Sequence, residues 1–316
     1  MSEIRVCFLG TPDFATVCLK RLLEDDHYKV VGVVTQPDRP SGRKLQLTPS
    51  SVKTLALQQG LPVLTPESLR REPEAVEIIK SWKAEIAVVV AFGQILDQNF
   101  LSLFPYGCVN VHASLLPRWR GAAPIQRSIE AGDTKTGVCL QKMVLKLDAG
   151  DVIGSREVAL DDQINSLELH DRLAVLGADL LHIEMMDYIR GYLAGMPQDE
   201  SLVTYAKKIE KTESELNFQE SASSLHNRVR AFVWGPGTYA LFLGKRLKIH
   251  KTSVIASSVA HATPGDIVEV QKDSFRVQTG EGLLEILEVQ PESKSRMAAA
   301  DFIKGFQIQK GMRLGN

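Results

Sequence analysis

The sequence lacks the features that mark secreted, membrane-spanning or metal-binding proteins. Its 316 residues contain only four cysteines and no C-x-x-C pair, so neither a disulfide framework nor a metal site is expected. Cys7, Cys108 and Cys139 lie in apolar runs, where a thiol behaves as a small buried hydrophobe. No apolar stretch approaches the ~20 residues that span a bilayer, and no basic segment followed by an apolar one opens the chain. We therefore expect a cytoplasmic protein without membrane segments.

An excess of charge of either sign is also missing. Lysine and arginine together number 37 and the acidic residues 38, which leaves a net charge of −1. No global positive field indicates a polyanionic partner, so any nucleic-acid-binding surface must be a local patch. Gly10, Thr11 and Pro12 do not complete a G-x-G-x-x-G fingerprint, which argues against dinucleotide binding.

The first part of the chain alternates short apolar, β-branched runs with amphipathic stretches. Valine and isoleucine runs without polar alternation are typical of strands buried on both faces, as in a mainly parallel sheet. Strand–helix repetition predicts an α/β fold with a doubly wound, Rossmann-like sheet. The predicted strands are residues 4–9, 30–35, 61–64, 86–90, 108–112, 136–143 and 152–158. The predicted helices are residues 12–23, 50–59, 74–82 and 166–192.

The texture of the sequence changes after residue 193, where shorter apolar pieces are separated by glycine-containing turns. Short strands at this spacing predict a small C-terminal β-barrel of the oligonucleotide-binding (OB-like) kind. We therefore predict a first domain at 1–193, a linker at 194–208 and a β-barrel domain at 209–316. The strands predicted in it are residues 239–243, 246–250, 267–270, 274–278 and 283–289.

The most informative stretch is VNVHASLLPRWRG at residues 109–121. Asn110 and His112 are two positions apart on a predicted strand, so both side chains point to one face. They end that strand, at the edge where open α/β sheets bind ligands. An amide beside an imidazole can stabilise the oxygen of a carbonyl that becomes tetrahedral, and the imidazole can move a proton. Taken alone, the two residues could equally satisfy the backbone of the following loop.

This stretch resembles the signature of the folate-dependent formyltransferases, and LDAGD at 147–151 resembles the loop that carries their aspartate. The stretches GTPDFA (10–15), TQPDRPSGR (35–43) and SLLPRWRGAAPIQR (114–127) are similar to the members that act on methionyl-tRNA. The resemblance implies that Asn110, His112 and Asp148 are the catalytic residues and that the fold is the formyltransferase fold. In two places the chain departs from the family pattern: MVLKLD stands at 143–148 where M-D-x-G-L-D is common, and the 36–49 loop has one basic residue fewer.

The resemblance further implies the substrates. The donor is expected to be 10-formyltetrahydrofolate, bound as a cosubstrate without a metal, and the acceptor the α-amino group of initiator methionyl-tRNA. From the pattern alone, the AFGQIL turn at 91–96 could instead be ordinary strand–helix packing. The residues expected to contact folate are Phe92, Gly93, Gln94, Ile95, Leu96, Ser114, Leu115, Leu116 and Pro117.

Two basic regions are candidates for binding tRNA. The loop at 36–49 is long, polar and proline-rich, and it follows a strand at the same edge of the sheet as the predicted site. In KRLKIHK at 245–251 the basic residues alternate with Leu247 and Ile249, so they face outward from a strand. A solvated loop and a charged strand that resists edge pairing are the alternatives. Lys207, in the predicted linker, is expected to extend this path. The residues expected to contact tRNA are Arg39, Arg43, Lys44, Lys207, Arg246 and Lys248.

Three other functions remain open at this point. The chain could formylate a small amine such as glycinamide ribonucleotide or an amino sugar, or it could hydrolyse formyl-folate. It could also be a non-catalytic RNA-binding module with an inert α/β domain. We expect a monomer that works in bacterial-type or organellar translation.

Overall fold

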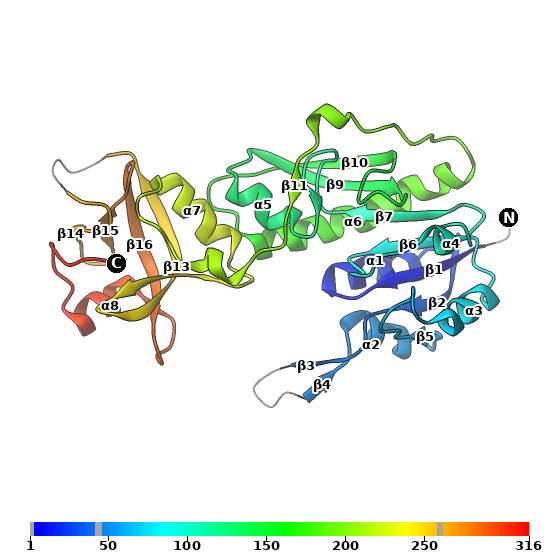
Figure 1. Cartoon of the computed structure of the whole chain (residues 1–316), viewed down its shortest axis with the longest axis horizontal. Helices are drawn as coiled ribbons and strands as arrows, with labels where there is room; N and C mark the ends of the chain where they lie inside the picture. Colours follow the sequence, from blue (N-terminus) through cyan, green and yellow to red (C-terminus); the bar gives the residue numbers. More distant parts are fainter. Residues whose placement is uncertain (1–2, 42–45, 258–261, 316) are drawn as a thin grey trace. The chain divides into compact units, whose positions relative to one another are not determined.

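The computed structural model describes residues 3–41, 46–257 and 262–315. The chain forms two compact units (Figure 1). Unit 2 takes two short segments from the region that we assigned to the first domain, so the boundaries at 193 and 208 stay a prediction. Unit 1 comprises Met1–Gly121, Thr136–Val158 and His170–Tyr205, and unit 2 comprises Ala122–Lys135, Ala159–Leu169 and Ala206–Asn316.

A seven-stranded sheet forms the centre of unit 1. Its order is β10 (Val152–Ala159), β9 (Lys135–Lys142), β7 (Cys108–His112), β6 (Ile86–Val90), β1 (Ile4–Gly10), β2 (Tyr28–Val34) and β5 (Val63–Leu64). The run from β7 to β5 is parallel, and β9 is antiparallel to β7. Figure 1 shows β7, β6, β1 and β2 side by side. The predicted doubly wound, mainly parallel α/β sheet is confirmed.

The order of the strands reverses at β1, because β2 lies on one side of it and β6 on the other. The carboxyl ends of β1 and β6 therefore flank the switch point at which such sheets bind ligands. The turn after β1 needs glycine, since a Cβ on Gly10 would lie 2.7 Å from the Cβ of Ala15. The helices that accompany the sheet are α1 (Asp13–Leu23), α2 (Ser51–Gln58), α3 (Pro73–Ser81), α4 (Gln98–Leu101) and α6 (Ser166–Ile189).

The apolar runs of the sequence form the interior of this sheet. Every residue of β6 and β7 is buried, in agreement with strands covered on both faces. All four cysteines are free and buried, and burial raises the pKa of the Cys139 thiol to about 11. In the described ranges, no helix combines the length and the apolar character needed to cross a bilayer.

Short paired strands lie outside the main sheet. The predicted loop at 36–49 contains an antiparallel ribbon of β3 (Arg39–Ser41) and β4 (Gln46–Thr48). A second pair joins β8 (Arg120–Gly121) to β11 (Tyr205–Ala206). This second pair ties the segment after β7 to the segment that we predicted as a linker.

Unit 2 contains an antiparallel sheet whose edges are bridged by the end of the chain. The sheet has the order β12 (Thr238–Phe242), β13 (Lys245–Ile255), β16 (Leu283–Pro291), β15 (Phe275–Gln278) and β14 (Ile267–Val270), with β17 (Met297–Ala298) on β16. Gly315 donates its backbone N–H to Leu241 of β12 at 2.8 Å, and Ile267 of β14 donates to Met312 at 2.7 Å. The antiparallel C-terminal fold is confirmed, and residues 312–315 satisfy backbone groups of both edge strands.

The sequence did not reveal the helices of unit 2, which are α5 (Pro124–Glu130), α7 (Ala222–Ala231) and α8 (Ala299–Phe306). The inner face of α7 explains why. Beside Leu225 and Val229 it buries His226 and Arg230, which a hydrophobic pattern counts as polar. Most of their polar atoms have partners: His226 bonds Thr252, and Nη1 of Arg230 donates to the backbone carbonyls of residues 161 and 164. The Nε of Arg230 is buried without a partner among the described residues.

A buried carboxylate in unit 1 makes part of the stability pH-dependent. Asp25, between α1 and β2, accepts hydrogen bonds from the backbone and the ring of His27 and from the ring of His182 on α6. Burial acts to raise the pKa of Asp25, but these hydrogen bonds outweigh it and the pKa lies below its ordinary value. The ionised form is therefore the one that stabilises the fold.

We expect Asp25→Asn to lower the free energy of unfolding by about 1–3 kcal/mol at pH 7. Because the pKa is lower in the folded state, this contribution is present above the unfolded-state pKa of about 3.9 and is lost as the pH falls. Urea unfolding of both proteins across this pH range measures the difference. Asp26→Asn, at the exposed neighbouring position, is the control. An equal loss in both variants, or a loss that does not shrink at low pH, would contradict the prediction.

Candidate functional site

Strand β7 carries two of the predicted site residues at its carboxyl end. Asn110 and His112 are two positions apart and therefore share a face. On the adjacent antiparallel strand β9, Gln141 lies opposite Asn110, and Cys139 lies opposite His112. Both side chains are buried, with 9% of Asn110 and 6% of His112 exposed. This edge of the sheet thus presents an amide and an imidazole on the same side.

The two ring nitrogens of His112 face different partners. Nε2 lies 2.9 Å from the backbone oxygen of Trp119, and because a carbonyl only accepts, the nitrogen donates. Nδ1 faces Oδ1 of Asp148 at 3.8 Å, which is longer than a direct hydrogen bond. The turn after β7 therefore holds the Nε2 side of the ring, and the Nδ1 side faces the Asp148 carboxylate.

Asp148 is held in place by groups from two other segments. Its Oδ2 accepts the backbone N–H of Gly121 at 2.8 Å, and its Oδ1 accepts Nε2 of Gln141 at 3.2 Å. The residue has a φ of +47°, a left-handed conformation that residues other than glycine rarely adopt. Such strain often occurs at functional sites. The backbone of the loop thus aims the carboxylate toward His112.

Asn110 differs from His112 and Asp148 in the hydrogen bonding of its side chain. Its buried amide makes no hydrogen bond to any residue in the ranges 3–41, 46–257 and 262–315. A buried amide without a partner costs free energy unless a ligand or solvent satisfies it. The structure therefore brings Asn110, His112 and Asp148 to one place and leaves the amide available for a substrate. Their catalytic roles stay a prediction.

The turn after β7 is held by its own hydrogen bonds. Ser114 is fully buried, and its hydroxyl donates to the carbonyl of Arg118 at 2.7 Å. The backbone N–H of Trp119 donates to the hydroxyl of Thr204 at 2.9 Å. Of the segment 114–117 expected to contact folate, the Ser114 side chain thus stabilises the turn. Leu115, Leu116 and Pro117 are half-buried, and contact of this segment with folate stays a prediction.

The turn after β6, expected to form the folate wall, contains side chains with different roles. Phe92 and Leu96 are buried, whereas Ile95 is 81% exposed. Gln94 is committed to the neighbouring loop, since it accepts from the backbone of Leu69 and donates to the carbonyl at position 66. Gly93 is exposed, which leaves its backbone accessible to a ligand.

Exposed apolar side chains also occur on the loop that carries Asp148. Val144, Leu145 and Leu147 are all substantially exposed. The loop begins at Met143, which packs on the hydrophobic cluster that includes Phe92 and Leu96. The two segments therefore share one apolar base and both present apolar side chains outward, an arrangement suited to a flat heterocycle.

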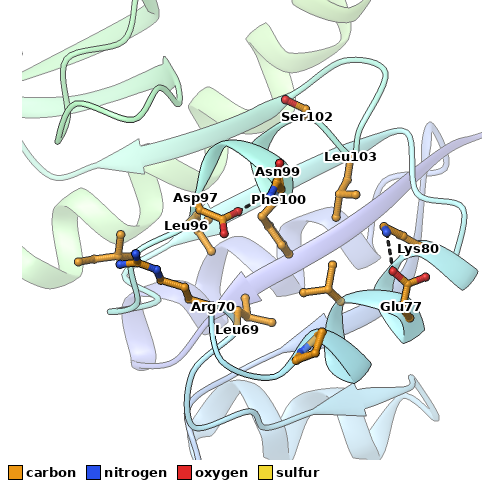
Figure 2. Close-up of a pocket in the computed structure, with 13 residues that line it drawn as sticks. Leu69, Arg70, Glu77, Lys80, Leu96, Asp97, Asn99, Phe100, Ser102 and Leu103 are labelled. Carbon is orange, nitrogen blue, oxygen red and sulfur yellow. Dashed lines mark hydrogen bonds and ion pairs between the residues drawn. The ribbon is translucent and has the colours of Figure 1, made fainter.

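Two pockets of unit 1 lie near this turn. One, of about 430 Å³, is at the switch point and is lined by residues that include Thr11, Gln36 and Phe92. The other, of about 510 Å³, lies between α3 and α4. Figure 2 shows this second pocket, with Leu69 and Leu96 on its walls and the ion pair of Lys80 with Glu77 at its rim. Neither pocket contains Asn110, His112 or Asp148.

The basic residues predicted to contact tRNA are divided between the units. Arg39 belongs to unit 1, is exposed, and donates from Nη2 to Oε1 of Gln36 at 3.4 Å. Arg43 and Lys44 lie outside the described residues. Part of the predicted loop at 36–49 forms the ribbon of β3 and β4.

In unit 2, β13 alternates as predicted from its sequence. Leu247 and Ile249 are in the core, whereas Arg246 and Lys248 are exposed. The guanidinium of Arg246 lies 4.7 Å from the centre of the Tyr239 ring. Lys207 is exposed as well. Contact of these residues with tRNA stays a prediction.

Sequence reasoning missed several polar residues of the site. Gln141 bonds Asp148 directly, and Arg120 and Gln198 lie behind the same loop. The only signal for Gln141 is its register opposite Asn110, which the antiparallel pairing of β9 decides. No spacing in the sequence connects Gln198 with a loop 50 residues earlier.

Comparison with known proteins identifies the family of the chain. Residues 4–183 match the model of the family described as formyl transferase, and residues 208–307 match that of the formyl transferase C-terminal domain. The methionyl-tRNA formyltransferase of Bdellovibrio bacteriovorus is 60% identical over 317 residues, which covers 100% of both chains. The protein of the same name from Bacillus subtilis is 44% identical over 312 residues and 98% of both chains.

Solved structures support the same fold. The N-formyltransferase of Helicobacter canadensis, in complex with folinic acid and dTDP-3-aminofucose, has a TM-score of 0.69 at 18% identity over 92% of this chain and 100% of that chain. At such identity the likeness concerns the fold alone. Because both family models match in order and full-length relatives are 60% and 44% identical, this chain belongs to the formyl transferase family.

Proposed function

We propose that this formyltransferase transfers the formyl group of 10-formyltetrahydrofolate to the α-amino group of methionyl initiator tRNA. The product is N-formylmethionyl-tRNA for translation initiation. One observation carries the proposal: the grouping of Asn110, His112 and Asp148 occurs in a chain that is 60% identical, from end to end, to a methionyl-tRNA formyltransferase. We also propose that the chain acts as a monomer in the cytoplasm or an organelle with bacterial-type translation.

The reaction is acyl transfer from one nitrogen to another. The acceptor must be a neutral amine; a free α-amino group has a pKa of about 7.7–8.0, and esterification of the carboxyl lowers it. Much of the acceptor is therefore reactive at neutral pH. Attack on the formyl carbon forms the new C–N bond and an oxyanion. Collapse re-forms the carbonyl and breaks the bond to the folate nitrogen, which leaves with the proton that the attacking amine loses, so that tetrahydrofolate is the second product. The side-chain amide of Asn110 donates a hydrogen bond to this oxyanion.

His112 and Asp148 are proposed to handle the proton and the charge. The carboxylate 3.8 Å from Nδ1 stabilises positive charge on the ring. Asp148 acts either by orienting His112 and stabilising its charge directly or by positioning a water that carries the proton.

The folate is proposed to lie against the exposed apolar side chains of the two loops. Ile95 on one side and Leu145 and Leu147 on the other offer apolar contact to the pterin ring. The exposed backbone near Gly93 offers hydrogen bonds to its edge. In unit 1 the tRNA is proposed to contact Arg39, together with Arg43 and Lys44, which lie outside the described residues. In unit 2 it is proposed to contact Lys207, Arg246 and Lys248.

Formylation of two methionyl-tRNAs tests the proposed function. We expect the chain with 10-formyltetrahydrofolate to formylate initiator methionyl-tRNA much faster than elongator methionyl-tRNA. Glycinamide ribonucleotide and an amino-sugar nucleotide are the control acceptors and should not react. Equal rates on the two tRNAs would remove the initiator claim and leave formyl transfer intact. Comparable formylation of a small amine would instead support a small-molecule enzyme.

Removal of each predicted catalytic group tests the site. Asn110→Ala, His112→Ala and Asp148→Asn should each lower kcat by about 10²–10³, the usual effect of losing a preorganised group that stabilises developing charge. Folate affinity, measured by equilibrium titration, should change little. Asp26→Asn replaces an exposed carboxylate and should behave as wild type. The assignment would be wrong if the three folded variants kept near-normal turnover.

The exposed basic residues of β13 provide a separate test. Arg246→Ala with Lys248→Ala should weaken binding of tRNA and reduce the dependence of log K on log salt by about 1 for each lost phosphate contact. The kcat at saturating tRNA should stay unchanged. Lys272→Ala, at an exposed position of the same unit, is the control. An unchanged salt dependence in the double variant would exclude β13 from the interface.

A further inference from the structure

A side chain from the segment predicted as a linker holds the loop that carries Asp148. Nε2 of Gln198 donates to the backbone oxygen of Asp148 at 2.8 Å and to that of Gly150 at 2.7 Å. A longer contact of 3.5 Å reaches Oε1 of Gln141. The two N–H groups of one amide thus bind the carbonyls on either side of Ala149.

A buried arginine decides which way this amide points. Arg120 donates from Nε and Nη2 to Oε1 of Gln198, at 3.0 and 2.8 Å. A guanidinium has donors only, so the oxygen of the amide must face it and the nitrogen must face the loop. Because Arg120 can only donate, the oxygen and the nitrogen of the Gln198 amide cannot exchange places.

Glu200 balances the charge of Arg120 and also binds Lys146, which belongs to the loop that carries Asp148. Arg120 is fully buried, and its Nη2 lies 2.9 Å from Oε1 of Glu200. Oε2 of Glu200 binds Nζ of Lys146 at 2.6 Å. The hydrogen bonds from Arg120 and then Lys146 hold the pKa of Glu200 at about 2, so Glu200 stays ionised. A buried guanidinium needs such a counter-charge.

The loop has little freedom to adjust around these contacts. A Cβ on Gly150 would lie 1.6 Å from the backbone oxygen of Lys142, so the chain returns tightly against the end of β9. Asp148 itself is in the left-handed conformation, which the surroundings must sustain. The hydrogen bonds from Gln198 supply part of that support directly at the carbonyl of Asp148.

We propose that Gln198, oriented by Arg120, is a positioning residue that holds the Asp148 carboxylate at its working distance from His112. The inference rests on the proposed function, because it assigns Gln198 a role in that reaction. Gln198 touches neither the substrates nor the reacting atoms; it acts through the backbone of Asp148. Its effect therefore belongs to the chemical step and not to the binding of folate or tRNA.

Gln198→Glu is the sharpest test, because it keeps the size of the side chain and the acceptor for Arg120. In this variant a carboxylate oxygen takes the place of the NH2 group of Gln198. An oxygen cannot donate to the backbone carbonyls of Asp148 and Gly150, so both hydrogen bonds to the loop are lost. We expect kcat to fall by about tenfold or more, while KM for both substrates stays within about twofold. Gln163→Glu makes the same chemical change at an exposed position and should have no effect. Gln198→Met, with similar volume and no polar group, should match Gln198→Glu and serves if the latter does not fold.

A second measurement separates positioning from a general structural role. In the Asp148→Asn background, Gln198→Glu should lower kcat by less than about twofold further, because residues that act as a unit are not additive. Full additivity with Asp148→Asn, a loss confined to KM, or unchanged kcat in both folded Gln198 variants would each overturn the proposal. Formylation by the wild-type chain is scored separately, so failure of the proposed function is distinguishable from failure of this inference.

Discussion

The Asp148 carboxylate lies 3.8 Å from Nδ1 of His112, and hydrogen bonds from the surrounding segments hold it in this position. Three segments far apart in the chain contribute: the backbone of Gly121, the amide of Gln141 and the amide of Gln198. They act on a residue in a backbone conformation that is unfavourable for any side chain with a Cβ. In the proposed reaction, such preorganisation means that no rearrangement is needed when charge develops in the transition state.

The two units differ in the groups that they carry. Unit 1 holds every group of the Asn110, His112 and Asp148 site, together with the exposed apolar side chains beside it. Unit 2 contributes an antiparallel sheet whose strand β13 exposes Arg246 and Lys248. With a net charge of −1, the tRNA binding proposed for this chain would depend on the placement of such residues and not on a general field.

Much of the fold could be read from local pattern. The buried runs of β6 and β7 and the alternation of β13 follow directly from side-chain periodicity, because one or both faces of a strand must be apolar. The helix α7 could not be found in this way, since His226 and Arg230 are buried on its inner face. His226 bonds Thr252 and Arg230 donates to the backbone carbonyl of residue 164, both more than 20 positions away, and no local pattern contains that information.

The sequence by itself determined the main strands of the two large sheets, the fold class and the pair formed by Asn110 and His112, but not short strands such as β3, β4, β8 and β11. Their spacing of two along a strand is a local property of the backbone, and resemblance to the formyltransferases added Asp148. Only the tertiary structure decided what faces that pair. The register of β9 against β7 places Gln141 opposite Asn110, and the return of the chain at Gln198 reaches the Asp148 loop. Both depend on pairing and packing between distant segments, which the order of residues along the chain does not specify locally.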